Sequence, residues 1–175
     1  MDWLSIREFI FDFVKLIVVI VVILFLIIYV VSITQVVGSS MSSTLQDGDV
    51  LILNKIKYRF TDIKRGDIIS LEYADTKYLI KRVIGLPGDT VLIRDNTLYI
   101  NGEVYVENYL DEGLVYDDFD LSSLGYDVIP EDMYLVLGDN RPDSLDSREI
   151  GLISKDEVIG KVSFRIWPLN KLAAF

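Results

Sequence analysis

A serine-rich turn, a lysine within an apolar strand and a dense polar loop are the three segments of this sequence whose residues could do chemistry. The chain of 175 residues contains neither histidine nor cysteine. Without histidine there can be no Ser–His–Asp triad and no His-ligated metal. Without cysteine there can be no thiolate nucleophile, disulfide or Cys-based zinc site. The nucleophiles that remain are serine, threonine, lysine and the carboxylates.

The serine-rich turn reads GSSMSSTL over residues 38–45 and offers four hydroxyl nucleophiles, Ser39, Ser40, Ser42 and Ser43. Serine and glycine are also common in turns, so the composition alone favours a plain polar linker. Residue types by themselves do not single out one serine.

The lysine lies in the strand-like run YLIKRVI, residues 78–84. Side chains alternate along a strand, so Lys81 shares a face with Leu79 and Val83. Poor solvation on that face, together with the like charge of the neighbouring Arg82, lowers a lysine pKa toward the range of a usable general base. The alternative is an edge-strand lysine whose ammonium reaches water.

The polar loop GDNRPDSLDSR, residues 138–148, directly follows the apolar run Tyr134–Leu137. A simple turn needs glycine, proline, asparagine or aspartate, but not the serines and two arginines that this loop also carries. Asp146 and Arg148 are spaced to pair along an extended segment. A calcium-binding loop is a weaker interpretation, because the acidic spacing and terminal glutamate of an EF-hand are missing.

A membrane anchor precedes these segments. Residues 16–34 contain no charged side chain, and 19 residues of helix span roughly 28 Å, close to the hydrocarbon thickness of a bilayer. A cleaved secretory signal usually has a shorter apolar region. Arg7 and Lys15 precede the span, and the next cation is Lys55, which predicts a cytoplasmic N-terminus, residues 1–15, and an extracytoplasmic domain.

Residues 36–175 are long enough for one compact domain and read as short strands separated by turn signals. The strongest signal is a hairpin around Asn101-Gly102, a pair that suits a type I′ turn. We expect a mainly β fold, with antiparallel strands in a barrel-like or two-sheet arrangement. The predicted strands are 49–54, 68–73, 78–84, 90–93, 97–100, 103–106, 134–137 and 158–166.

An acidic insertion interrupts the strands at about residues 107–130. Its central part, residues 111–127, has scattered aromatic residues but no clear period, which predicts a solvated excursion. The whole chain has a net charge of −10, which argues against nucleic acid as a partner.

Taken together, the three segments resemble the type I bacterial signal peptidases, serine proteases with a Ser–Lys dyad. The family has a Ser-Met-x-Pro-Thr-Leu segment just after a membrane anchor, which here reads SMSSTL over 40–45. Its Lys-Arg strand followed by Gly-Leu-Pro-Gly-Asp corresponds to residues 81–89, and its Gly-Asp-Asn-Arg segment to residues 138–148. The single anchor and short insertion are similar to the small Gram-positive type. One residue departs from the pattern, because Ser43 stands where the family usually has proline.

Carried onto this chain, the resemblance makes Ser40 the nucleophile and Lys81 the general base. Ser144 would orient the neutral lysine by a hydrogen bond, and the backbone N–H of Ser40 would form the oxyanion hole. Some relatives have a serine two residues before the nucleophile, where this chain has Gly38. The other implied supporting residues are Met41 and an ion pair behind the site formed by Asp146 and Arg148, with Arg82 as a further member.

The resemblance also implies how the protein is used. It predicts a plasma-membrane endopeptidase that removes signal peptides from exported preproteins, with no metal or cofactor. Val36, Gly38 and Ile80 would line the pockets for a small-residue cleavage motif. Two alternatives are a self-cleaving Ser–Lys repressor-type protease, which would carry a DNA-binding domain in place of the anchor, and an anchored β domain that binds exported proteins without cutting them. The residues leave the oligomeric state open.

Overall fold

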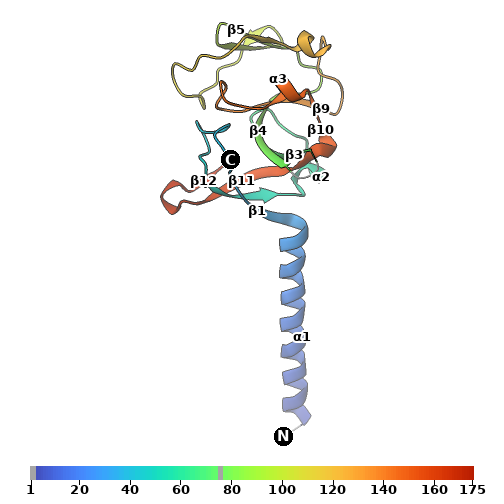
Figure 1. Ribbon diagram of the computed structural model, residues 1–175. Coiled ribbons are helices and arrows are strands. Elements are labelled where there is room, and N and C mark those ends of the chain that lie inside the picture. The colour runs from blue at the N-terminus through green and yellow to red at the C-terminus, as the bar shows by residue number, and fades with distance from the viewer. Residues whose placement is uncertain (1–2, 75–76) are drawn as a thin grey trace.

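The protein is a long N-terminal helix joined to an antiparallel β domain (Figure 1). The computed structural model describes residues 3–74 and 77–175. The helix α1 (Trp3–Phe25) continues into a π-helical turn, η1 (Leu26–Val30). Residues Ile6–Val30 are long and apolar enough to cross a membrane, and none of the side chains in the most apolar window is buried against the rest of the protein. The expected apolar anchor is therefore present as a free-standing helix.

The helix ends four residues earlier than predicted. Residues 31–34, expected inside the membrane span, belong to β1 (Val31–Gln35), which pairs with β2 (Val50–Asn54) at all five positions. Val31 and Ile33 are apolar and β-branched, so hydropathy alone cannot separate them from the helix, although such residues favour strands. The pairing with β2 satisfies their backbone groups instead.

The β domain contains two antiparallel sheets, which confirms the mainly β prediction. The described residues form an eight-stranded sheet in the order β1-β2-β11-β3-β4-β9-β10, with β12 beside β11, and a four-stranded sheet in the order β7-β6-β5-β8. The remaining elements are α2 (Lys57–Phe60), β3 (Ile68–Tyr73), β4 (Lys77–Gly85), β5 (Val91–Arg94), β6 (Thr97–Ile100), β7 (Glu103–Val104), β8 (Phe119–Asp120), η2 (Leu121–Leu124), β9 (Met133–Leu137), α3 (Ser147–Ile150), β10 (Ile153–Ser154), η3 (Lys155–Glu157), β11 (Val158–Trp167), η4 (Leu169–Lys171) and β12 (Ala173–Ala174).

The predicted Asn-Gly hairpin is present. Asn101 and Gly102 both have positive φ, at 55° and 79°, and join β6 to β7. Positive φ at both central residues is what a type I′ turn requires.

The prediction of a solvated insertion is wrong in its central part. Tyr116, Phe119 and Leu121 are buried in the core cluster that joins the smaller sheet to β9. Phe119 also lies in β8, which pairs with β5. The acidic residues between these positions face solvent, so the mean hydropathy of the segment is low and does not reveal its buried apolar residues. Burial of each of the three side chains stabilises the fold by about 1.5–3 kcal/mol.

Candidate functional site

The Ser40 turn is anchored on one side by apolar packing. Met41 and Leu45 are 1% and 0% exposed and belong to a core cluster with Val36, Leu51 and Ile68. From the other side, the backbone N–H of Asn140 donates to the Ser40 carbonyl oxygen at 3.0 Å. Ser40 is therefore held between the large sheet and the polar loop 138–148.

Lys81 reaches Ser40 from strand β4. Its Nζ atom lies 2.7 Å from Ser40 Oγ, within hydrogen-bond distance. Lys81 pairs with Ile69 of β3, and its side chain is 1% exposed. Leu79 and Val83 pack in a single apolar cluster, as expected for residues on one face of a strand. The interpretation of Lys81 as a snorkelling edge lysine is therefore wrong.

Burial lowers the pKa of Lys81 from 10.5 to about 8. Desolvation, which penalises the charged form, is the largest cause. The carboxylates of Asp146 and Asp139 oppose the shift, and the guanidinium of Arg148 adds to it. Arg148, and not the neighbouring Arg82 expected from the sequence, is the like charge that contributes to this shift. Arg82 has another partner.

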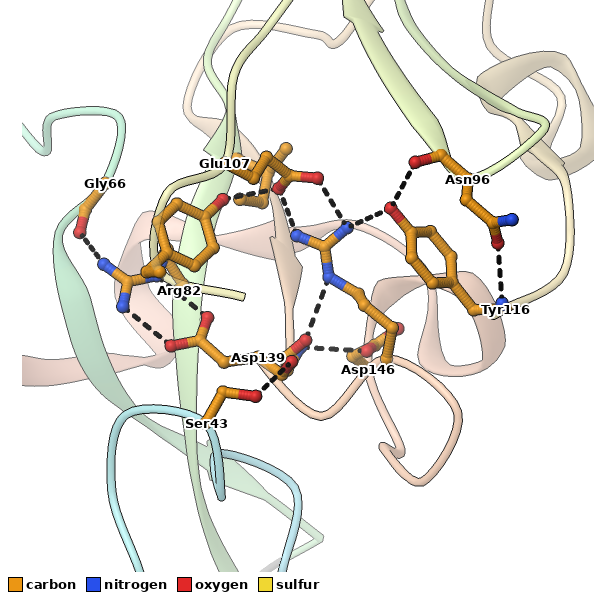
Figure 2. A network of polar contacts seen from close by, with 12 residues as sticks. Ser43, Gly66, Arg82, Asn96, Glu107, Tyr116, Asp139 and Asp146 are labelled. Carbon is orange, nitrogen blue, oxygen red and sulfur yellow. Dashed lines mark hydrogen bonds and ion pairs between the residues drawn. The ribbon is translucent and has the colours of Figure 1, made fainter. Parts of the chain in front are cut away.

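That partner is Asp139, and not the Asp146 that the sequence suggested. Arg82 Nε and Nη2 donate to the two carboxylate oxygens of Asp139 at 2.9 and 2.7 Å, a bidentate pair that Figure 2 shows. Arg82 Nη1 donates to the carbonyl oxygen of Gly66 at 3.0 Å, and the guanidinium stacks on the ring of Tyr109. Thr44, four residues after Ser40, donates its hydroxyl proton to Asp139. The pair thereby ties β4 to the Ser40 turn.

The predicted pair of Asp146 and Arg148 is present. Arg148 Nε and Nη2 donate to the Asp146 carboxylate at 2.8 and 2.9 Å, and the backbone N–H of Gly138 donates to it at 2.9 Å. Asp146 is fully buried. Gly138 has no room for a side chain, because a Cβ atom there would lie 2.5 Å from the Ser40 carbonyl oxygen. Close contact between the polar loop and the Ser40 turn requires glycine at this position.

Ser144 does not make the expected hydrogen bond to Lys81. Its hydroxyl is buried and has no partner among the described residues, and it lies against Gly138. The ammonium of Lys81 points to Ser40 instead. A buried hydroxyl without a partner is costly, so Ser144 is an unsatisfied polar group beside the Ser40 turn.

Two of the three neighbouring serines have other side-chain partners. Ser39 donates to the carboxylate of Asp143, and Ser43 Oγ donates to Asp111 Oδ2 at 2.8 Å. In the described part of the chain, Ser40 is the one serine of the turn that is bonded to a lysine. The geometry therefore selects Ser40 from the four hydroxyls.

A small pocket opens beside Ser40. It has a volume of about 200 Å³, and its lining includes Val36, Met41, Tyr78 and Ile80. Gly38, which has a φ of 95°, lies two residues before Ser40 in the chain. The volume is below the roughly 300 Å³ of pockets that hold drug-sized ligands, and it suits a small side chain. Of the three pocket residues that the resemblance implied, Val36 and Ile80 do line this cavity, whereas Gly38 is not part of its lining.

Sequence reasoning missed the buried ion pair between Arg141 and Glu107. Both side chains are almost fully buried, and the Arg141 guanidinium lies 5.3 Å from the centre of the Tyr116 ring. Arg141 Nε donates to the Gly138 carbonyl oxygen at 3.1 Å. The available signal was that the polar loop carries two arginines, Arg141 and Arg148, which a simple turn does not explain.

Comparison with known proteins gives one family. The model of the family described as signal peptidase, peptidase S26, matches residues 10–167. The chain is 37% identical over 155 residues to signal peptidase IB of Staphylococcus aureus, covering 82% of this chain and 81% of that protein. It is 40% identical over 144 residues to signal peptidase I of Bacillus caldolyticus, covering 78% and 79%. A crystal structure of a signal peptidase I from Enterococcus faecalis is similar at a TM-score of 0.54 and 39% identity, over 59% of this chain and 98% of that one.

Proposed function

The chain belongs to the signal peptidase family, peptidase S26, and from this premise we propose that Ser40 and Lys81 are the dyad with which it cleaves signal peptides from preproteins. It is a membrane-anchored serine peptidase of the type I signal peptidases. The observation that carries the assignment of the dyad is the 2.7 Å contact between Lys81 Nζ and Ser40 Oγ, made by a lysine with a pKa of about 8.

The reaction follows from this contact. Neutral Lys81 accepts the proton of Ser40 Oγ while Oγ bonds to the carbonyl carbon of the scissile peptide. The Ser40 N–H makes no hydrogen bond among the described residues, so it is free to donate to the developing oxyanion. When the tetrahedral intermediate collapses, Lys81 returns its proton to the amine of the mature protein, which leaves. Lys81 then takes a proton from the water whose oxygen bonds to the ester carbonyl carbon, and it gives that proton to Ser40 Oγ as the bond between Oγ and the acyl carbon breaks. The signal peptide leaves with a free carboxylate, and Lys81 is neutral again.

The preprotein would bind in extended form beside β4. Residues 77–81 of that strand pair with β3 on one side, whereas pairing with β9 on the other side begins only at Arg82. The free edge offers backbone donors and acceptors for strand addition. The small pocket lined by Val36 and Ile80 would then receive a small side chain near the cleaved bond.

The supporting residues would act on the dyad rather than on the substrate. Asp139 with Arg82, and Asp146 with Arg148, hold the Ser40 turn and the polar loop against β4. The unpartnered hydroxyl of Ser144 would bond to Lys81 Nζ once Ser40 has been acylated, when Oγ is no longer available to share a proton.

The orientation proposed is cytoplasmic for the N-terminus and extracytoplasmic for the β domain. The cations Arg7 and Lys15 on the N-terminal side support it. The site would then face the side of the membrane on which an exported chain emerges, and the lipid bilayer would be a partner of the apolar helix.

The test is cleavage of a purified preprotein in detergent, with the new N-terminus identified by mass spectrometry. The full-length chain should release one product cut after a small residue. Ser40→Ala should abolish that product while Ser39→Ala and Ser42→Ala, the matched controls, retain it. If Ser40→Ala cleaves normally, the assignment of the nucleophile is wrong, and if the wild-type chain cleaves no preprotein, the proposed activity is wrong.

A further inference from the structure

A basic pocket lies where the apolar helix meets the β domain. It has a volume of about 590 Å³. Its wall on the helix side is formed by the last turn, with Ile28 and Tyr29. Its wall on the domain side comes from two segments that are distant in sequence. One is α2 with the turn before it, which includes Lys55 and Arg59, and the other is η3 with the start of β11, which includes Lys155.

The charge of this pocket is opposite to that of the protein. Three cations and one carboxylate, Asp156, line it, whereas the whole chain has a net charge of −10. Among residues 3–74 and 77–175, none of the three cations takes part in an ion pair. The ion pairs there are formed by other cations, for example by Lys161 with Asp67. Unneutralised cations gathered in one pocket favour an anionic ligand.

The pocket lies at the end of the membrane span, and this position favours a lipid as the anionic ligand. Ile28 and Tyr29 belong to the segment Ile6–Val30 that is apolar enough to cross a bilayer. The pocket therefore opens where the helix leaves the hydrocarbon layer, the depth at which lipid phosphates lie. Tyrosines at this depth, here Tyr29 and Tyr58, are typical of membrane interfaces.

Lys55 links the two walls and still has donors to spare. Its Nζ donates to the Ile28 carbonyl oxygen at 2.8 Å, one of the backbone acceptors freed at the end of the helix. An ammonium has three donors, so two remain for a ligand. A pocket with one wall continuous with a membrane span and the other wall cationic matches a molecule with an acyl chain and a phosphate.

We propose that this pocket binds the phosphate headgroup of an anionic phospholipid from the leaflet that the β domain faces. The lipid would be held by Lys55, Arg59 and Lys155, with its acyl chains along the end of the helix. Strand β1 begins at Val31, directly after the helix, and Ser40 follows nine residues later, so the bound lipid would fix the height of the site above the membrane. The inference concerns the anchor and does not depend on the identity of the catalytic residues.

The experiment measures lipid binding to the full-length chain in detergent micelles by native mass spectrometry. Phosphatidylglycerol and phosphatidylcholine with the same acyl chains are titrated separately. The test variant is Arg59→Gln with Lys155→Gln, which leaves the hydrogen bond of Lys55 in place. The matched control is Lys64→Gln with Arg94→Gln, which removes two exposed cations that do not line the pocket. A conservative pair, Arg59→Lys with Lys155→Arg, checks that charge is what matters.

Each cation near a membrane surface contributes about fivefold in affinity for anionic lipid. The wild-type chain, the control and the conservative pair should bind phosphatidylglycerol about tenfold or more tightly than phosphatidylcholine, and the test variant should lose that preference. Equal binding of both lipids by the wild-type chain, or an unchanged preference in the test variant, would overturn the proposal.

A further experiment adds inorganic phosphate at millimolar concentration. Displacement of phosphatidylglycerol by free phosphate would assign the pocket to a soluble anion instead of a lipid.

Discussion

The burial of Lys81 is the residue-scale feature on which the proposed dyad depends. A lysine with the ordinary pKa of 10.5 is neutral in less than about one molecule in a thousand at pH 7, whereas a pKa of about 8 raises that fraction to roughly one in ten. The cause is desolvation within β4, and the carboxylates of Asp139 and Asp146 keep the shift from going further. The lowered pKa is what lets Lys81 serve as the proposed general base in a chain without histidine.

The pH dependence of cleavage follows from this pKa. The proton must leave Lys81 before it can act as a base, so kcat/KM should rise with pH and level off above about 8, the pKa of Lys81 in the free enzyme. Below that value kcat/KM should fall about tenfold per pH unit. Initial rates of preprotein cleavage at low substrate concentration, from pH 5.5 to 9.5, measure the profile, and circular dichroism at each pH controls for unfolding. A flat profile between pH 6 and 9 would exclude Lys81 as the titrating base.

Ser43 offers a test of how the Ser40 turn is stiffened in this chain. Its N–H makes no hydrogen bond among the described residues. Its hydroxyl lies 2.8 Å from Asp111 Oδ2 and 3.4 Å from the Asp139 carbonyl oxygen. Ser43→Ala should remove these contacts of the hydroxyl only. Ser43→Pro should remove the same contacts but also restrict the unfolded chain, so it should be more stable than Ser43→Ala by about 0.4–1 kcal/mol while remaining active. Thermal unfolding of both variants in one detergent makes the comparison. A proline variant less stable than the alanine variant would show that the turn has a backbone conformation that proline cannot adopt.

At the scale of elements, the insertion is fastened to the polar loop by the pair of Arg141 and Glu107. Both groups are buried, so loss of one leaves the other charge without compensation. Glu107→Gln should therefore lower the free energy of unfolding by about 3–5 kcal/mol. Glu103→Gln in the exposed strand β7 is the matched control and should change it by less than about 0.5 kcal/mol. Urea unfolding of the two variants tests this, and a loss below 1 kcal/mol in Glu107→Gln would contradict the burial of the pair.

The elements that could be predicted from sequence are those with local signals. The apolar helix and the hairpin at Asn101-Gly102 each follow from a stretch of a few neighbouring residues. Strand β1 was missed because its pairing with β2 is a contact with residues about twenty positions away. The insertion was misjudged for a similar reason, since Tyr116 and Phe119 become buried only when the smaller sheet and β9 close over them.

The same difference between local signals and contacts of distant residues explains which features of the site could be predicted. Alternation within one strand predicted that Lys81 is poorly solvated, and the resemblance selected Ser40 from its neighbours. The partner of Arg82 could not be predicted, because it depends on the register of two strands: Arg82 pairs with Leu137 of β9, which places Asp139 just beyond the strand end and within reach of the guanidinium. The resemblance had placed Arg82 with the pair of Asp146 and Arg148 instead.

At the scale of the whole molecule, the anchor determines which compartment the site faces. With a cytoplasmic N-terminus, protease added outside cells stripped of their wall should digest the β domain and leave an N-terminal tag intact. The physical reason is the retention of Arg7 and Lys15 on the cytoplasmic side. Immunoblots against the tag and against the C-terminus measure both ends in one sample, and detergent lysis provides the control in which both are digested. Protection of the C-terminus in unlysed cells would reverse the orientation.

The most direct test of the account is the kcat/KM for preprotein cleavage by Ser40→Ala, Lys81→Ala and the double variant, compared with the wild-type chain. Residues that act as one unit are not additive, because removing either partner of the 2.7 Å contact disables the other. Each single variant should lose several orders of magnitude in kcat/KM, and the double variant should lose no more than the worse of the two. Losses that multiply in the double variant, or substantial cleavage by folded Lys81→Ala, would show that Ser40 and Lys81 do not form the catalytic dyad.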